Sequence, residues 1–446
     1  SVLDPGGSIY LSDGVFHRTQ VETAFGPLRN DDAAIFRFEP RTGRFETYIA
    51  YGFANPHGKV FDRWGNDFVT DATGNNTYFA PAFSGHIDYP RKHSGMREFW
   101  NRPSRPCPGT GILSSRHFPD EFQGNYLNCN VIGFQGIFRV RVTEEGSGLK
   151  GETLENIVSS TDPNFRPSCV SVGPDGALYF SDWHNPIIGH MQHHLRDPNR
   201  DKVHGRVYRM TYEGRPLLKP ALIAGQPVPA LLELLKSPED NVRERAKIEL
   251  GARETKDVIP AAKQWVAGLD RKEPEFEHHR TEALWVHQWH NVVDTSLLAD
   301  VLASPDHRAR AAATRVLCYW RDRVPDALAR FKAMAADVHP RVRLEAVRAA
   351  SFFREASAAD VALEALRNPT DYYLDYTMRE TLRQLEPVWR KAIADGKPVA
   401  ADNPAGIEYL MRSASTAELL KFPRTPGVLT TLLRRPDVAE IGRAHV

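Results

Sequence analysis

Residues from 229 onward repeat one pattern, in which two helical segments flank a short polar break. Residues 229–236 are apolar, residues 237–240 contain a serine and a proline that end the segment, and residues 241–250 begin the next helix. Within that second helix, Val242 and Leu250 are spaced so that they share one face. A single hairpin cannot bury its apolar face, so several hairpins must stack on one another.

The hairpin returns along the rest of the chain. Further copies are expected at residues 297–320, 327–353 and 361–385, with a weaker copy around residues 265–289. Four copies carry an arginine near the start of the second helix, namely Arg243, Arg280, Arg310 and Arg343. Their intervals of 37, 30 and 33 residues are typical of helix-pair solenoids. The sequence therefore predicts a HEAT-like α-solenoid over residues 229–440.

Glycine separates this half from the first one. Of the 31 glycines, 24 lie in residues 1–216, where they supply the turns between short β-branched runs. The expected strands are residues 34–38, 44–50, 59–62, 67–71, 136–142, 169–172, 177–181 and 205–210. The fold class is therefore multidomain, a β domain followed by an α domain.

One unit recurs inside the β domain. A strand, a turn and a second strand lead to an aspartate, which is Asp71 in one copy and Asp182 in another, and residues 1–12 with Asp13 resemble a third copy. Repeated units of this kind predict the blades of a β-propeller, and three copies are too few to close one. We therefore expect a partial β-propeller over residues 1–216.

The domain limits follow from these patterns. Residues 217–228 form a short, proline-containing linker between the partial propeller and the solenoid. Residues 441–446 resemble the translation of a sequencing adaptor, which predicts a non-native tail; a natural polar tail is the alternative. On the first interpretation the sequence is a fragment of a longer protein.

Net charge, hydropathy and cysteine spacing exclude some classes of partner and cofactor. The net charge of +1 gives no basic surface for nucleic acid, and no apolar run is long enough to cross a membrane as a helix. The four cysteines have no zinc or haem spacing. One disulfide among Cys107, Cys129 and Cys169 and a set of buried free thiols are both open interpretations.

Two segments could carry chemistry. His57 follows an Asn-Pro turn at a strand entrance, where propeller blades line their channel, and we predict it as a catalytic base; the alternative is a turn histidine. Arg166, Asp182 and His184 surround a strand end, and we predict that they bind a cofactor. The alternative is that Asp182 caps a loop. The helical spacing of Trp285 and Trp289 favours packing in the core. No metal site is predicted.

The segment around these residues resembles a family of large secreted proteins from planctomycete-type bacteria, described as membrane-bound dehydrogenases. The resemblance rests on Gly173-Pro174-Asp175-Gly176, Asp182-Trp183 and Pro198-Asn199-Arg200-Asp201, in this order. The family combines a glucose/sorbosone dehydrogenase-like propeller, HEAT repeats and a C-terminal cytochrome c domain. The resemblance therefore implies a periplasmic or secreted protein.

The expected propeller is similar to soluble glucose and sorbosone dehydrogenases, which use pyrroloquinoline quinone and calcium and carry an Arg-Asn-Pro-x-Gly motif whose arginine contacts the quinone. The matching segment is residues 54–58, where Ala54 replaces that arginine. The resemblance implies an oxidoreductase that oxidises a sugar or alcohol and passes electrons to a haem c domain beyond this chain. The alternative is a non-catalytic scaffold that binds glycan on the propeller or protein on the solenoid.

Overall fold

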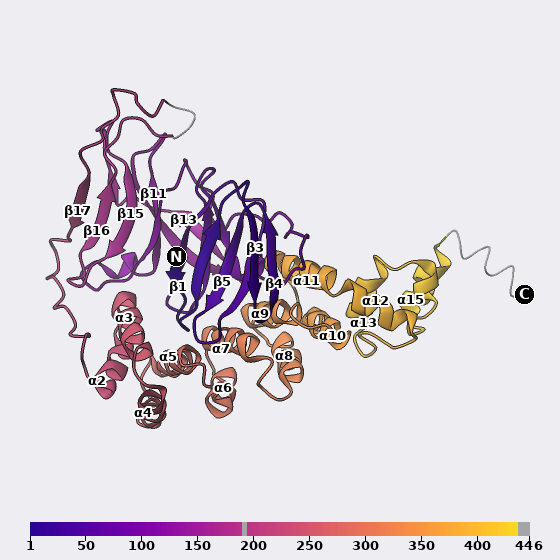
Figure 1. Ribbon diagram of the computed structural model, residues 1–446. Coiled ribbons are helices and arrows are strands. Elements are labelled where there is room, and N and C mark those ends of the chain that lie inside the picture. Colours follow the sequence, from indigo (N-terminus) through magenta and orange to yellow (C-terminus); the bar gives the residue numbers. More distant parts are fainter. Residues whose placement is uncertain (190–193, 436–446) are drawn as a thin grey trace, which may run out of the picture. The chain divides into compact units, whose positions relative to one another are not determined.

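The structure, a computed structural model, describes residues 1–189 and 194–435 (Figure 1). The first part of the chain consists of β-sheets and the second part of helices, in agreement with the predicted order. The predicted tail at residues 441–446 and the last residues of the predicted solenoid lie outside the described residues.

All the sheets are antiparallel. Three of them are β1(Val2–Leu3)-β2(Ile9–Asp13)-β5(Ala34–Glu39)-β6(Arg44–Ala50), the hairpin β3(Arg18–Thr23)-β4(Gly26–Asp31), and β7(Pro56–Phe61)-β8(Asp67–Asp71)-β9(Asn76–Phe79). The next is β10(Thr110–Leu113)-β11(Asn125–Asn130)-β12(Gly136–Glu145)-β13(Gly148–Thr153), with β14(Val158–Ser159) on β12. The last is β15(Pro167–Val172)-β16(Leu178–Asp182)-β17(Arg206–Met210). Each sheet except the first is a meander of sequential strands.

Successive sheets meet along β2, β7, β10 and β15, and the last three of these are the first strands of their sheets. Strand β2 lies against β7, β7 lies against β10, and β10 lies against β15. Side chains between the last two large sheets form one apolar core, which includes Leu127, Ile137, Phe165 and Leu178. Leu127, Ile137 and Leu178 come from strands, whereas Phe165 lies in the loop before β15.

The sequence did not predict the hairpin β3–β4. Its strands read RTQVET and GPLRND, in which most side chains are polar and exposed. A hairpin of this kind lacks the apolar alternation by which strands are recognised. Its buried contribution is small and includes Leu28, which packs with Ala34 and Phe36 of β5.

The helical part is a series of hairpins. Its helices are α2(Val228–Glu233), α3(Asp240–Gly251), α4(Thr255–Ala267), α5(Phe276–Trp289), α6(Thr295–Leu302), α7(His307–Trp320), α8(Ala327–Ala335), α9(Pro340–Ala350), α10(Ser357–Glu364), α11(Tyr372–Gln384), α12(Glu386–Ala394), α13(Pro404–Met411), α14(Thr416–Leu419) and α15(Pro426–Leu433). The aspartates Asp294 and Asp371 cap α6 and α11 by accepting two backbone N–H bonds each. None of the described helices is both long and apolar enough to span a membrane.

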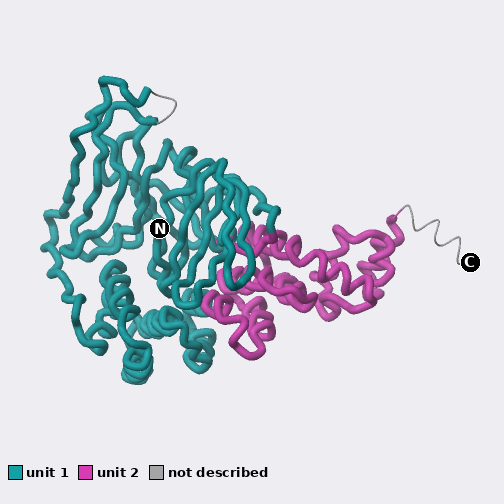
Figure 2. Tube along the Cα trace, in the orientation of Figure 1, with its two compact units in different colours: residues 1–83, 89–145, 149–313 teal, residues 84–88, 146–148, 314–446 magenta. Residues whose placement is uncertain are grey.

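The chain divides into two compact units (Figure 2). The first unit contains residues 1–83, 89–145 and 149–313, so helices α2–α6 belong with the sheets. The second unit contains residues 84–88 and 146–148 together with the chain from residue 314 onward. Inside this unit, Ser147 donates its backbone N–H and its hydroxyl to Asp371, at 2.7 and 2.6 Å.

All four cysteines are free thiols, as one of the two sequence interpretations holds. Cys107, Cys129 and Cys318 are buried, whereas Cys169 is exposed on β15. Burial raises the pKa of the Cys107 thiol to about 12, because the thiolate would lose its hydration.

Candidate functional site

A cavity of about 610 Å³ lies where four sheets meet, mainly along strands β1, β2, β7, β10 and β15, and we call it the first-strand cavity. Val2 and Tyr10 come from the first sheet, His57 from β7, Thr110 from β10, and Ser168 and Cys169 from β15. The sheets thus converge on one space with both apolar and polar walls, although their lining residues are spread over more than a third of the chain.

His57 is exposed on the wall of this cavity and lies opposite Thr70 in the ladder between β7 and β8. The ladder is irregular between His57 and Val60, and such a bulge re-aims the side chains next to it. Partial burial and the charge of the chain's amino group lower the pKa of His57. The imidazole is therefore neutral at neutral pH and can accept a proton.

Gly58 allows β7 to approach β10 at this point. Its φ is +68°, and a methyl group there would lie 2.9 Å from Thr110 Cγ2. The Thr110 hydroxyl donates to the Gly58 carbonyl oxygen at 2.6 Å. A glycine is thus required for both the backbone conformation and the contact.

Lys59 supplies a buried cation beside the cavity. Its ammonium group pairs with the fully buried Asp67 and lies 4.4 Å from the ring centroid of Tyr10. The pairing removes the cost of an isolated buried charge, and it leaves this lysine as a structural anchor between β7 and β8. The sequence analysis did not single out Lys59, Thr110 or Ser168, although all three lie on first strands.

Arg166, Asp182 and His184 are brought together, as predicted, but by the backbone. Asp182 Oδ1 accepts the N–H groups of Arg166 at 2.7 Å and of His184 at 2.8 Å. The guanidinium of Arg166 donates to the carbonyl oxygens of Phe165 and Pro186. The carboxylate thus caps the loop, which is the alternative that the sequence left open for Asp182.

The atoms around Arg166, Asp182 and His184 show what kind of group could bind there. Asp182 Oδ2 lies 3.6 Å from Arg206 Nη1, and His184 Nε2 lies 3.6 Å from Asp201 Oδ2. Arg166 Nε, Asp182 Oδ2 and His184 Nδ1 are buried without a hydrogen-bond partner in the described part of the chain. A buried water or a small polar group would satisfy these atoms.

Calcium and a quinone fit this arrangement poorly. Calcium needs six or more oxygen ligands, whereas the two carboxylates here, Asp182 and Asp201, lie beside an arginine and a histidine, and no group of three acidic, histidine or cysteine ligands gathers there among the described residues. None of the three residues lines the first-strand cavity, in which His57 lies. Cofactor binding by Arg166, Asp182 and His184 therefore stays a prediction. These three residues do not line the cavity that contains the predicted base, His57.

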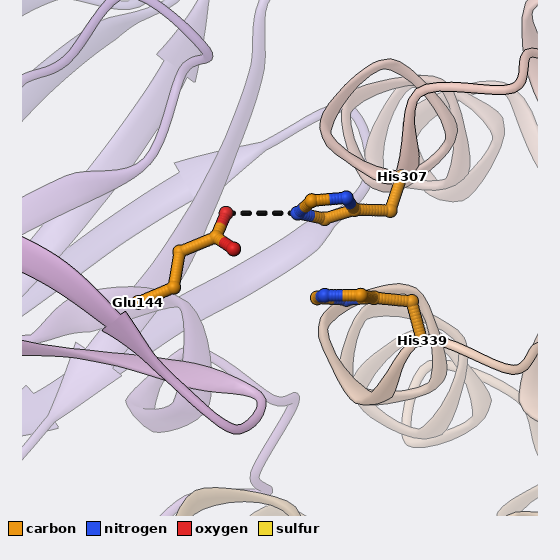
Figure 3. Close-up of side chains that lie close together, drawn as sticks. All are labelled: Glu144, His307 and His339. Carbon is orange, nitrogen blue, oxygen red and sulfur yellow. Dashed lines mark hydrogen bonds and ion pairs between the residues drawn. The ribbon is translucent and has the colours of Figure 1, made fainter.

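Glu144 and His307 form another acid–histidine pair in the first unit (Figure 3). His307 Nε2 and Glu144 Oε1 are 2.8 Å apart, at the end of β12 and the start of α7. His339, drawn in the same figure, belongs to the second unit, where its Nδ1 caps α9 by accepting the Arg341 N–H. Two ligand atoms alone do not make a metal centre.

Comparison with known proteins identifies two regions. Residues 104–214 match a family model described as a domain of unknown function (DUF7133). Residues 295–383 match a model described as HEAT repeats, which confirms the predicted HEAT-like region. No curated protein matches the chain.

Proposed function

We propose that the β domain is a partial β-propeller that binds a sugar or a related alcohol in the first-strand cavity. The single observation that supports this proposal is the convergence of β2, β7, β10 and β15, from four sheets, on a cavity of about 610 Å³ that His57 lines. Cavities of this size hold small molecules, and propellers commonly bind ligands where their innermost strands meet.

The chemistry of the wall suits a polyhydroxylated ligand. The His57 imidazole and the hydroxyls of Thr110 and Ser168 supply acceptors and donors, while Val2 and Ile35 supply apolar surface. A sugar presents hydroxyl groups and C–H faces, so it can satisfy both kinds of surface. In this complex the neutral His57 imidazole accepts a hydrogen bond from a ligand hydroxyl.

A second candidate function is oxidation of the bound sugar or alcohol. The lowered pKa of His57 favours it, because a neutral imidazole can take the proton of the hydroxyl that is oxidised. The hydride needs a cofactor, since side chains cannot accept it. Ala54 and the engaged Arg166 and Asp182 leave the quinone without an evident binding residue, so we derive no step through it.

Helical repeats often serve as protein-binding surfaces, and we propose that role for the HEAT region. Its hairpins would then hold a protein partner while the β domain holds the small ligand. Secretion to the periplasm or beyond, and electron transfer to a haem c domain, are proposals that rest on the family resemblance.

Ligand binding is tested with the whole chain and a panel of free monosaccharides and sugar alcohols, followed by saturation-transfer NMR. His57→Ala should abolish binding in the first-strand cavity, while His17→Ala, on an exposed side chain, should leave it unchanged. Addition of pyrroloquinoline quinone, calcium and a redox dye then separates the two candidates. Dye reduction supports the oxidoreductase, and binding without reduction supports the binding protein. The absence of saturable binding by any member of the panel overturns both.

A further inference from the structure

A second cavity, of about 320 Å³, lies within the first unit, and we call it the Gln288 cavity. The turns around Gly6 and Arg41 form one side, and the helix ends at Gly251, Arg253 and Gln288 form the other. It shares no lining residue with the first-strand cavity. None of the proposed functions uses it.

Gln288 is the central polar group of this cavity. Its residue is only 4% exposed, yet its amide makes no hydrogen bond with any described residue. The amide lines the cavity, so its donors and its acceptor stay free for water or for a ligand there. An amide carries donors and an acceptor, so it matches a ligand group that both accepts and donates.

Gly6 packs directly against this amide. A methyl group on Gly6 would lie 2.2 Å from Gln288 Cδ, a distance at which the two groups would collide. Any other residue at position 6 would therefore push the amide out of its place. The first sheet and α5 approach each other here only because position 6 lacks a side chain.

Trp289 lines the same cavity and is half-buried. A methyl group on Gly251 would lie 2.0 Å from its Nε1, and one on Gly7 would lie 2.5 Å from its Cδ2. Its indole N–H donates to no described residue. Trp289 therefore offers an aromatic surface together with an unused donor, next to the Gln288 amide.

The charges on the wall balance. Arg41 and Arg253 face the cavity together with Glu39 and Glu254. Arg41 donates to the Gly251 carbonyl oxygen at 2.7 Å, and Arg253 pairs with Glu249 at 2.6 Å. An anion would meet the two glutamates and a cation would meet the two arginines, so this wall favours a neutral polar ligand.

We propose that the Gln288 cavity is a second ligand site, which binds one neutral sugar ring. The Gln288 amide bonds two neighbouring hydroxyl groups of the ring, one as donor and one as acceptor. The Trp289 indole covers a C–H face, and the cavity's volume limits the ligand to about one ring. The charged side chains at the rim bond the remaining hydroxyls.

The test uses the whole chain and the methyl glycosides of glucose, galactose, mannose, xylose and N-acetylglucosamine as probes. Binding is followed by tryptophan fluorescence and by saturation-transfer NMR. In Gln288→Leu, which keeps the side-chain size, affinity should fall about tenfold or more, as expected for two lost hydrogen bonds. Gln264→Leu, on the exposed face of α4, should bind like the unchanged protein.

Two further variants keep the test decisive. Trp289→Phe removes the indole N–H but retains an aromatic ring, and it should weaken binding even if Gln288→Leu does not fold. His57→Ala should leave this binding intact, which separates it from binding in the first-strand cavity. The proposal is overturned if no glycoside binds, if both cavity variants bind normally, or if inorganic phosphate or glycine binds there more tightly than every glycoside.

Discussion

The carboxylates of Asp71 and Asp182 stabilise two copies of the same strand connection in the same way. Asp71 accepts the N–H groups of Ala54 and Asn55, at 2.7 and 3.0 Å, just as Asp182 accepts that of Arg166. Each aspartate is paired across the ladder with a proline, Pro56 in one copy and Pro167 in the other. The repeat that the sequence suggested is thus a repeat of hydrogen bonds.

The matching continues one residue further. The N–H of Ala72 donates to the Asn55 carbonyl oxygen at 2.8 Å, and the N–H of Trp183 donates to the Arg166 carbonyl oxygen at 2.9 Å. Asn55 and Arg166 therefore occupy equivalent positions. This equivalence accounts for the backbone position of residue 166.

Asp182→Ala should destabilise this connection, because the N–H groups of Arg166 and His184 would be buried without an acceptor. We expect a loss of about 1–3 kcal/mol in local opening free energy. Hydrogen-exchange mass spectrometry of residues 163–184 measures it. Asp13→Ala, which removes a more exposed carboxylate, should change exchange much less; equal effects of the two variants would contradict the capping role.

Glu282→Gln should be far more damaging. Glu282 is 1% exposed and accepts from Arg243 Nε at 2.9 Å and from Lys247 Nζ at 2.7 Å. Its neutralisation leaves Lys247 without its counter-ion and Arg243 with Asp240 alone, which costs about 3 kcal/mol or more. Urea unfolding measures the loss. Glu249→Gln, in the surface pair with Arg253, should cost less than about 1 kcal/mol, and a similar loss in both would disprove the buried network's importance.

His290 makes stability depend on pH. Its ring nitrogens contact the Leu250 carbonyl oxygen at 3.1 Å and the Thr255 hydroxyl at 3.0 Å. Burial, and then the nearby charge of Arg41, lower its pKa from 6.5 to about 4. The folded state therefore binds the proton less well than the unfolded state, so stability is full above pH 6.5 and falls as the pH drops toward 4.

His290→Gln should reduce this slope, since glutamine does not titrate. The free energy of unfolding is measured in urea at several values of pH across that window. His278, His279 and His287 also have pKa values lowered by burial, so the slope becomes smaller and does not vanish. His204→Gln, on an exposed side chain, serves as control, and an unchanged slope in His290→Gln would refute the assignment.

Thiol labelling distinguishes Cys169 from the other cysteines. In the folded chain one thiol should react quickly with a chromogenic disulfide reagent, and all four should react after unfolding in denaturant. Cys169→Ser should abolish the fast reaction. Because Cys169 lines the first-strand cavity, a sugar bound there should slow its labelling, and a rate independent of any ligand of that cavity would count against the site.

The sequence predicted what local patterns determine. The helical hairpins follow from their apolar spacing, and Trp285, expected in the core, is 4% exposed. Trp289 shares its helix and spacing, yet it is only half-buried and lines the Gln288 cavity. The difference comes from Gly7 and Gly251, which pack against the Trp289 ring although they lie in distant parts of the sequence. The residue spacing along one helix cannot predict contacts with distant segments, and hence the Gln288 cavity was not predicted.

The polar site was predicted only in part for the same reason. His57 was recognised because a strand entrance with an Asn-Pro turn is a local signal. Thr110 and Ser168 face the same cavity from later strands, and their order along the chain says nothing of that proximity. The side chains of Arg166 and His184 were chosen for their chemistry, whereas the structure uses mainly their backbone.

The first compact unit ends inside α7, at residue 313, and not at the linker after the sheets. A gene cut at the linker would thus strip the sheets of helices α2–α6 and open both the pair of Arg116 with Glu239 and the Gln288 cavity. Genetic recombination would keep these contacts only if it transferred the sheets and helices α2–α6 together. The segment that must be inherited as one piece therefore extends beyond the linker at residues 217–228, to residue 313.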